Sequence, residues 1–183
     1  MNRRTILRAS QHSNTAAREM LALLFAAEVL DPAAEFWIAM AWVSDVALYD
    51  SGYGEFDALV SRNGTGRVYL SDILVELALK GTSVNIVTRP DPSNDKFLDI
   101  LQRKATITRV QDHILLARSE TIHQKNLVGK DWFTDGSMNL TVNGLDHNVE
   151  NLTVHLNAEK TAEIRTNIRQ TWNGTLGAIN DPR

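Results

Sequence analysis

The segment FWIAMAWVS, residues 36–44, is apolar almost throughout and constrains the fold more than any other part of the chain. It is too short and too continuously apolar for an amphipathic helix. Such a run is typical of a buried central strand in a sheet that is covered on both faces. The segment therefore predicts an α/β protein. Trp37 and Trp42 are interpreted as packing residues on opposite faces of this strand.

Helical and strand patterns alternate around this segment. The predicted helices are residues 16–30, a helix capped by Ser71 and ended by Gly81, a helix capped by Ser93 or Asn94, and residues 158–172 capped by Asn157. The predicted strands are residues 83–88, 105–110 and several within 122–154. Residues 49–67 are predicted to be a loop with a short helix at 56–60. This order favours a mixed, partly parallel sheet flanked by helices.

Length and composition predict one domain over residues 1–183, with a loosely ordered start at 1–15. The chain is 43% hydrophobic and 22% charged, which is typical of a globular protein. It has no cysteine, which excludes disulfides, thiolate metal sites and a thiol nucleophile. The basic start MNRRTILRAS is followed by no apolar run, and no stretch is long enough to span a bilayer. We therefore expect a cytoplasmic protein without a membrane partner.

The net charge of -3 argues against a general nucleic-acid coat protein. Basic residues are nevertheless concentrated between positions 101 and 130. They are Arg103, Lys104, Arg109, Arg118, Lys125 and Lys130, against Asp112 and Glu120. On charge alone, this excess indicates an ordinary solvated face.

Residues 122–154 carry a candidate anion site. His123 and Lys125 are two apart, so on a strand both would face the same side. The turn Gly136-Ser137-Met138-Asn139 can add a hydroxyl, a carboxamide and backbone N–H donors. A histidine, a fixed cation and neutral donors together suit the cleavage of a phosphodiester, which is itself an anion.

These residues resemble the motifs of the phospholipase D superfamily, most closely its single-motif bacterial nuclease branch. The resemblance lies in His123-x-Lys125, the Gly-Ser-x-Asn turn and Asn148-x-Glu150-Asn151, and the upstream order of helices and strands is also similar. In the family, four residues separate the Lys from an Asp that supports the hairpin, and this chain has Lys130 at the position of that Asp. Asp131 follows one place later in a tight turn, and the resemblance implies that Asp131 and Gly136 support the hairpin instead.

The resemblance implies roles for the site residues. His123 would attack phosphorus to form a phosphohistidine, and Glu150 would orient its imidazole. Lys125, Ser137 and Asn139 would hold the phosphate, with Lys130 and Arg118 as further candidate substrate-binding residues. No metal and no cofactor are implied, and the histidine spacings do not favour a metal site.

A second His-x-Lys motif is needed and is absent from the chain. The other histidines are His12, His113, His147 and His155, and none has a Lys two residues later. Single-motif members of the family solve this by pairing two identical chains. The resemblance therefore implies an isologous homodimer with one composite site.

The leading hypothesis is a metal-independent phosphodiesterase that acts as a DNA endonuclease. Small bacterial members of this type resemble restriction or phage-defence components, which implies a protein partner in a larger system. One alternative is a phospholipid phosphodiesterase or transphosphatidylase. Another is a non-catalytic nucleic-acid-binding or scaffold protein, which the Lys130 departure favours. The sequence does not decide between DNA and RNA or between single and double strands.

Overall fold

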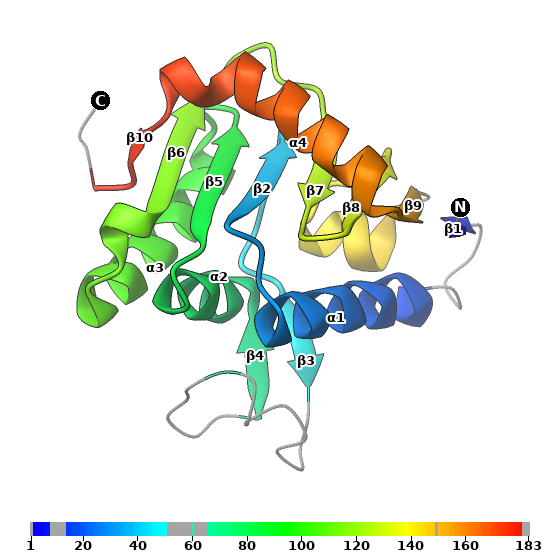
Figure 1. Ribbon diagram of the computed structural model, residues 1–183. Coiled ribbons are helices and arrows are strands. Elements are labelled where there is room, and N and C mark those ends of the chain that lie inside the picture. Colours follow the sequence, from blue (N-terminus) through cyan, green and yellow to red (C-terminus); the bar gives the residue numbers. More distant parts are fainter. Residues whose placement is uncertain (1, 8–13, 51–59, 61–65, 149, 181–183) are drawn as a thin grey trace.

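The predicted central strand lies in the middle of the sheet as β2 (Glu35–Met40). The computed structural model describes residues 2–7, 14–50, 60, 66–148 and 150–180. In these residues eight strands form one mixed sheet in the order β1-β9-β8-β7-β2-β5-β6-β10 (Figure 1). Helices pack on both faces of this sheet, which confirms the α/β fold class.

The strands of this sheet follow from the chain order. Their bounds are β1 (Asn2–Leu7), β2, β5 (Ser83–Thr88), β6 (Ile114–Arg118), β7 (Lys125–Val128), β8 (Trp132–Gly136), β9 (Asn151–Leu156) and β10 (Gly177–Ala178). β2, β5 and β6 are parallel, joined by helical crossovers. β7, β8, β9 and β1 each run antiparallel to their neighbours. A separate two-stranded sheet pairs β3 (Ala47–Asp50) with β4 (Arg67–Tyr69).

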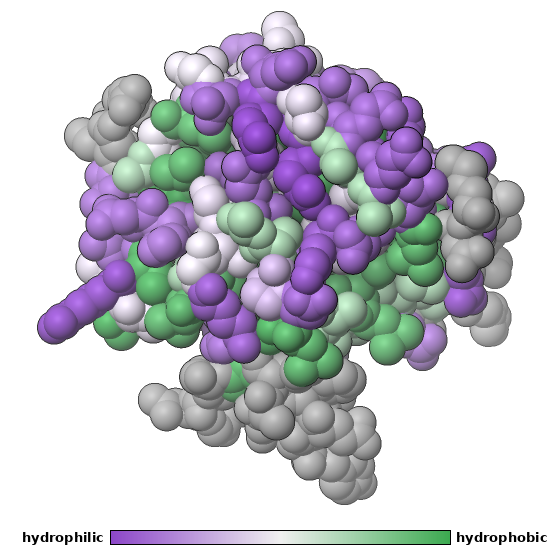
Figure 2. Space-filling model, viewed as in Figure 1, coloured by the Kyte–Doolittle hydropathy of each residue, from purple (hydrophilic) through white to green (hydrophobic). Residues whose placement is uncertain are grey.

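The helices divide between the two faces of the sheet. The helices are α1 (Asn14–Leu30), α2 (Leu70–Leu79), α3 (Pro92–Thr108) and α4 (Ala158–Trp172), with short turns η2 (Gln111–His113), η3 (Asn143–His147) and η4 (Asn173–Thr175). The larger core lies under α1, α2 and α3, and a smaller one lies under α4. α4 crosses the upper part of Figure 1, and the same region of Figure 2 is largely hydrophilic at its surface.

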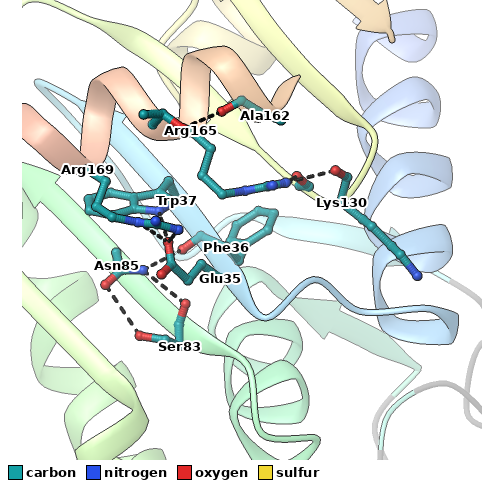
Figure 3. A network of polar contacts seen from close by, with 11 residues as sticks. Glu35, Phe36, Trp37, Ser83, Asn85, Lys130, Ala162, Arg165 and Arg169 are labelled. Atoms are coloured by element: carbon teal, nitrogen blue, oxygen red, sulfur yellow. Dashed lines mark hydrogen bonds and ion pairs between the residues drawn. The ribbon is translucent and has the colours of Figure 1, made fainter. Parts of the chain in front are cut away.

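Polar contacts anchor α4 to the sheet. Arg169 on α4 bonds Glu35, which also accepts from the indole of Trp37 at 3.2 Å. One turn earlier Arg165 reaches the β7–β8 turn and donates to the backbone carbonyls of Gly129 and Lys130 (Figure 3). α4 is therefore tied both to the start of β2 and to this turn.

The buried carboxylate of Glu28 ties α1 to the same turn from the opposite face. Glu28 is only 1% exposed and accepts from the backbone N–H of Ala33 at 2.9 Å and of Lys130 at 2.8 Å. It also accepts from the indole of Trp132 at 2.9 Å. Burial raises the pKa of Glu28, and these hydrogen bonds oppose that effect. The turn between β7 and β8 is thus held by an acidic residue from a distant helix.

Several sequence predictions of elements are confirmed, and others are wrong. β5 and α4 have the predicted bounds, and Gly81 follows α2 with a left-handed φ of 89°. The strand predicted at 105–110 is wrong, because α3 continues to Thr108. Ala105 is fully buried one helical turn beyond Leu101, so burial of a helical stripe outweighs the local β-propensity.

Asn157 caps α4 as predicted, and its side chain accepts from the N–H of Lys160 at 2.9 Å, but two other predicted caps differ. α3 is capped by Asp91, whose carboxylate accepts from the N–H of Ser93. α2 begins at Leu70, and the hydroxyl of Ser71 instead donates to Asp45 at 2.8 Å.

The start of the chain is more ordered than predicted. Residues 2–7 form β1, which pairs with β9 at the edge of the sheet. β3 and β4 appear where only a loop was predicted, while most of the helix predicted at 56–60 lies outside the described residues. No described helix is long and apolar enough to cross a membrane.

Candidate active site

Most of the predicted site residues meet at one edge of the sheet, where several strands begin or end. Lys125 begins β7 opposite Met40, the last residue of β2. Gly136 ends β8 opposite Leu152, one residue into β9. Because β7 and β9 start where β2, β5 and β8 end, their polar termini share this edge. It includes the carboxyl ends of the three parallel strands β2, β5 and β6, and ligands bind at such ends in open α/β sheets.

His123 and Lys125 lie next to each other at this edge. His123 is exposed in the segment just before β7, so the prediction that it lies on the strand together with Lys125 is wrong. The Lys125 Nζ donates to the His123 carbonyl at 2.7 Å and lies 3.4 Å from its Nδ1. The pKa of Lys125 is lowered by burial and by the nearby Arg89 guanidinium, while Glu150 opposes the shift. These three charged groups therefore lie close enough to interact.

The Gly-Ser-x-Asn turn is bonded to the start of β9. The N–H of Ser137 donates to the Asn151 side chain at 2.7 Å, and the N–H of Asn151 donates to the Ser137 hydroxyl at 3.1 Å. The Ser137 hydroxyl in turn donates to Glu150, whose other oxygen accepts from Asn148 at 3.3 Å. Gly136 has a φ of 135°, and a Cβ there would lie 2.3 Å from the Asn151 carbonyl. Only glycine fits this turn.

Asn139 connects the turn to the end of β2. Its side-chain oxygen accepts from the backbone N–H of Trp42 at 3.4 Å. Asn139, Glu150 and Trp42 line a cavity of about 540 Å³ beside the cluster. The site is therefore an open cleft with a polar pocket at one side.

Arg89 is a site residue that the sequence prediction missed. It follows β5 directly, and its guanidinium lies 5.1 Å from the ring centre of Trp42. Its Nε donates to the carbonyl of Ile122, which fixes the residue before His123. Its position in the sequence could have identified it. A cation that directly follows a strand of a parallel sheet lies at the carboxyl ends of the strands, where ligands bind.

The interpretation of the tryptophans needs correction. β2 ends at Met40, so the strand alternation does not extend to Trp42. Both Trp37 and Trp42 pack in the core under α4, and Trp42 additionally lines the cavity.

Three other predicted residues lie apart from this cluster. Lys130 and Asp131 are in the turn at the far end of β7. Lys130 pairs with Asp31, which raises the pKa of that lysine. The backbone N–H of Lys130 bonds Glu28, so Glu28 holds the turn where the family motif has an Asp. Arg118 ends β6 at the site edge, but its guanidinium pairs with Asp95 on α3 at 2.7 Å.

None of the other described histidines joins the cluster. His113 and His147 are exposed on η2 and η3. His155 bonds Asp135 at 3.0 Å and stacks on Phe133 with ring centres 4.3 Å apart. His12 lies outside the described residues.

The family model for the PLD-like domain of cardiolipin synthase matches residues 65–172, more than half of the chain. The chain belongs to this PLD-like family. The match includes the whole candidate cluster, from Arg89 to Asn151. The family relationship therefore confirms the resemblance seen in the motifs. No curated protein sequence matches this PLD-like chain.

Solved structures support the same fold. Nuc from Salmonella typhimurium, a phospholipase D family member, is 14% identical with a TM-score of 0.56, covering 97% of each chain. NucT from Helicobacter pylori is 13% identical with a TM-score of 0.55, covering 97% of this chain and 98% of that one. Phosphatidylserine synthase from Haemophilus influenzae is 13% identical with a TM-score of 0.54, and the match covers 97% of this chain but 39% of the synthase. At such identities the likeness shows a PLD-like fold, and the substrate has to be argued from the site.

Proposed function

We propose that this PLD-like protein is a phosphodiesterase that cleaves DNA without a metal ion, through a phosphohistidine intermediate. The observation that carries the proposal is the placement of two cations beside His123. The Lys125 Nζ lies 3.4 Å from the His123 Nδ1, and Arg89 donates to the carbonyl of Ile122, the residue before His123. Two cations beside a histidine suit the approach of a nucleophile to an anionic phosphodiester. Ser137 and Asn139 add neutral donors next to them.

The proposed reaction begins with attack by the His123 Nε2 on phosphorus. For this attack Nδ1 must carry the ring proton and donate it to an acceptor. Glu150 is a carboxylate at this edge, and it binds Ser137 and Asn148. We expect Glu150 to accept from Nδ1 when substrate displaces Lys125 from the ring. The N–P bond then forms as the bond to the leaving oxygen breaks.

The leaving oxygen needs a proton, and a second histidine would supply it. The same histidine would later take a proton from the water that breaks the N–P bond. Since the other described histidines lie elsewhere, we propose that His123 of a second copy fills this role in an isologous homodimer. Analytical ultracentrifugation at micromolar concentration tests this point, and a protein that turns over substrate as a monomer would contradict it.

DNA is the proposed substrate, and a restriction or phage-defence system is the proposed setting. With a net charge of -3, the chain offers little general attraction to nucleic acid. A partner protein in such a system would supply the missing affinity for DNA. We therefore expect weak, salt-sensitive DNA binding by the isolated protein.

The deciding experiment measures cleavage of plasmid DNA, single-stranded circular DNA and a bis-aryl phosphodiester in excess EDTA. Wild type is expected to cleave DNA and the aryl diester, and His123→Ala is expected to cleave neither. His113→Ala is the matched control, because His113 is an exposed histidine outside the cluster. Activity that EDTA abolishes, or that His123→Ala retains, would refute the proposed chemistry.

A further inference from the structure

The cavity beside the candidate active site is lined mostly by residues that the proposed phosphate chemistry does not use. These residues come from the segment after β2, the start of α3 and the segment between β8 and β9. Six of its lining residues are Trp42, Ser44, Ser93, Asn139, Asn143 and Glu150. Asn139 and Glu150 also belong to the candidate active site. A substrate bound there can therefore extend directly into this space of about 540 Å³.

The wall of the cavity differs in chemistry from the phosphate site. Among the described residues that line it there is no lysine or arginine, and Glu150 is the one ionisable side chain among them. The remaining groups of the described lining residues are amides, hydroxyls, an indole ring and the apolar side chain of Val142. Amides can donate to and accept from the edge of a nucleobase, and an aromatic ring can stack on its face. We infer that this cavity receives the nucleoside beside the scissile phosphate, and this inference rests on the proposed function. The substrate is then a single strand of nucleic acid.

The indole of Trp42 is held in place before any ligand binds. Its Nε1 donates to Asp91 at 3.3 Å, and the Arg89 guanidinium lies over the ring. Its backbone N–H is bonded to Asn139. A fixed ring loses little conformational entropy when a base packs against it.

The opposite wall is also held rigidly. Asn143 starts the π-helical turn η3, and π-helical turns occur frequently at functional sites. Arg18 on α1 clamps this turn by bonding both oxygens of Asp146, at 2.7 and 3.0 Å. A Cβ at Gly144 would lie 2.2 Å from the Asn139 carbonyl, so the turn packs tightly on the active-site segment. The exposed side-chain amide of Asn143 makes no hydrogen bond with another described residue and is open to a base.

A lipid would find a poor surface here. Among the large exposed apolar side chains of the described residues, only Val142 lines this cavity, and it is 49% exposed. A duplex would have to release a base from its stack before that base could enter, whereas a single strand would not. The cavity therefore favours single-stranded nucleic acid over both lipids and intact duplexes.

The test measures binding, so it does not depend on turnover. Isothermal titration compares thymidine 3′- and 5′-phosphates with methyl phosphate, and with glycerophosphoglycerol as the soluble lipid-headgroup diester. We expect wild type to bind one nucleotide at least about fivefold more tightly than methyl phosphate, as stacking of one base would give. Asn143→Ala and Trp42→Leu should reduce this ratio. Asn167→Ala on the exposed face of α4 is the matched control and should keep it.

The outcomes separate the inference from the proposed function. Equal affinities for nucleotide and methyl phosphate in wild type would overturn the nucleoside pocket, even if DNA is cleaved. Tighter binding of glycerophosphoglycerol than of either nucleotide would overturn it as well. A base-dependent affinity that Asn143→Ala weakens would support the pocket, even if no substrate is turned over and the proposed function fails. Asn143 is exposed on a surface turn, so this variant remains informative if Trp42→Leu does not fold.

Discussion

Replacing Glu28 with alanine tests how the β7–β8 turn is held. The change removes the acceptor for three donors, the buried N–H of Ala33, the buried indole N–H of Trp132 and the part-buried N–H of Lys130. At about 1 kcal/mol for each unsatisfied donor, the loss is about 3 kcal/mol. The cavity left by the side chain adds about 1 kcal/mol. The expected total of about 4 kcal/mol corresponds to a fall in Tm of about 8–16 °C for a chain of this size.

Glu28→Gln separates hydrogen bonding from charge. Burial raises the pKa of Glu28 above its ordinary 4.5, although its hydrogen bonds oppose this shift, so folding favours the neutral form relative to the unfolded chain. Glutamine is neutral and keeps one carbonyl oxygen, which can still accept from Lys130 and Trp132, but its NH2 group takes the place of the oxygen that accepts from Ala33. It should therefore recover part of the Tm that alanine loses. The folded state also binds the Glu28 proton more tightly than the unfolded chain does. Wild-type stability should therefore fall as pH rises from about 4.5 through the raised pKa, and the glutamine variant should lose this component.

Thermal unfolding followed by circular dichroism between pH 4 and pH 8 measures these effects. Glu120→Ala, at an exposed carboxylate, is the control and should change stability by no more than about 0.5 kcal/mol. A Tm for Glu28→Ala within about 1 °C of wild type would refute the proposed role of this carboxylate. A glutamine variant as unstable as the alanine variant would instead show that the charge is needed.

Two further predictions concern the site. The ammonium of Lys125 should be required for turnover, so kcat/KM should fall as pH rises through a pKa below the ordinary 10.5. Arg89→Gln removes a cation that repels the Lys125 ammonium, so the fall in kcat/KM should move to higher pH, whereas Arg89→Lys keeps the charge and should not move it. A fall at the same pH in Arg89→Gln and wild type would contradict the interaction between Arg89 and Lys125. Gly136→Ala should lower kcat by at least about tenfold, because the added Cβ would displace Asn151 and Ser137. Gly174→Ala, where a Cβ meets nothing within 4 Å, is its control, and equal kcat for the two variants would rule out this role of Gly136.

Short-range patterns determined much of this protein. The apolar run at 36–43 indicates a central strand, because eight consecutive apolar residues are typical of a strand buried in a sheet that is covered on both faces. The spacing of His123, Lys125 and the Gly-Ser-x-Asn turn indicated both the family and the residues of the cluster. These features are readable because each depends on residues that are close together in the chain.

Only the tertiary structure decided which distant residues join them. Arg89 reaches the site because β5 runs parallel to β2, and strand pairing between distant segments leaves no local pattern. The same holds for Glu28, which reaches the β7–β8 turn across about a hundred residues of chain. Tertiary burial also extended α3 through Thr108 and overrode the β-branched residues there. Lys130 was predicted to contact the substrate, but it lies in the turn of the β7–β8 hairpin and pairs with Asp31. That turn is at the opposite end of β7 from the candidate site.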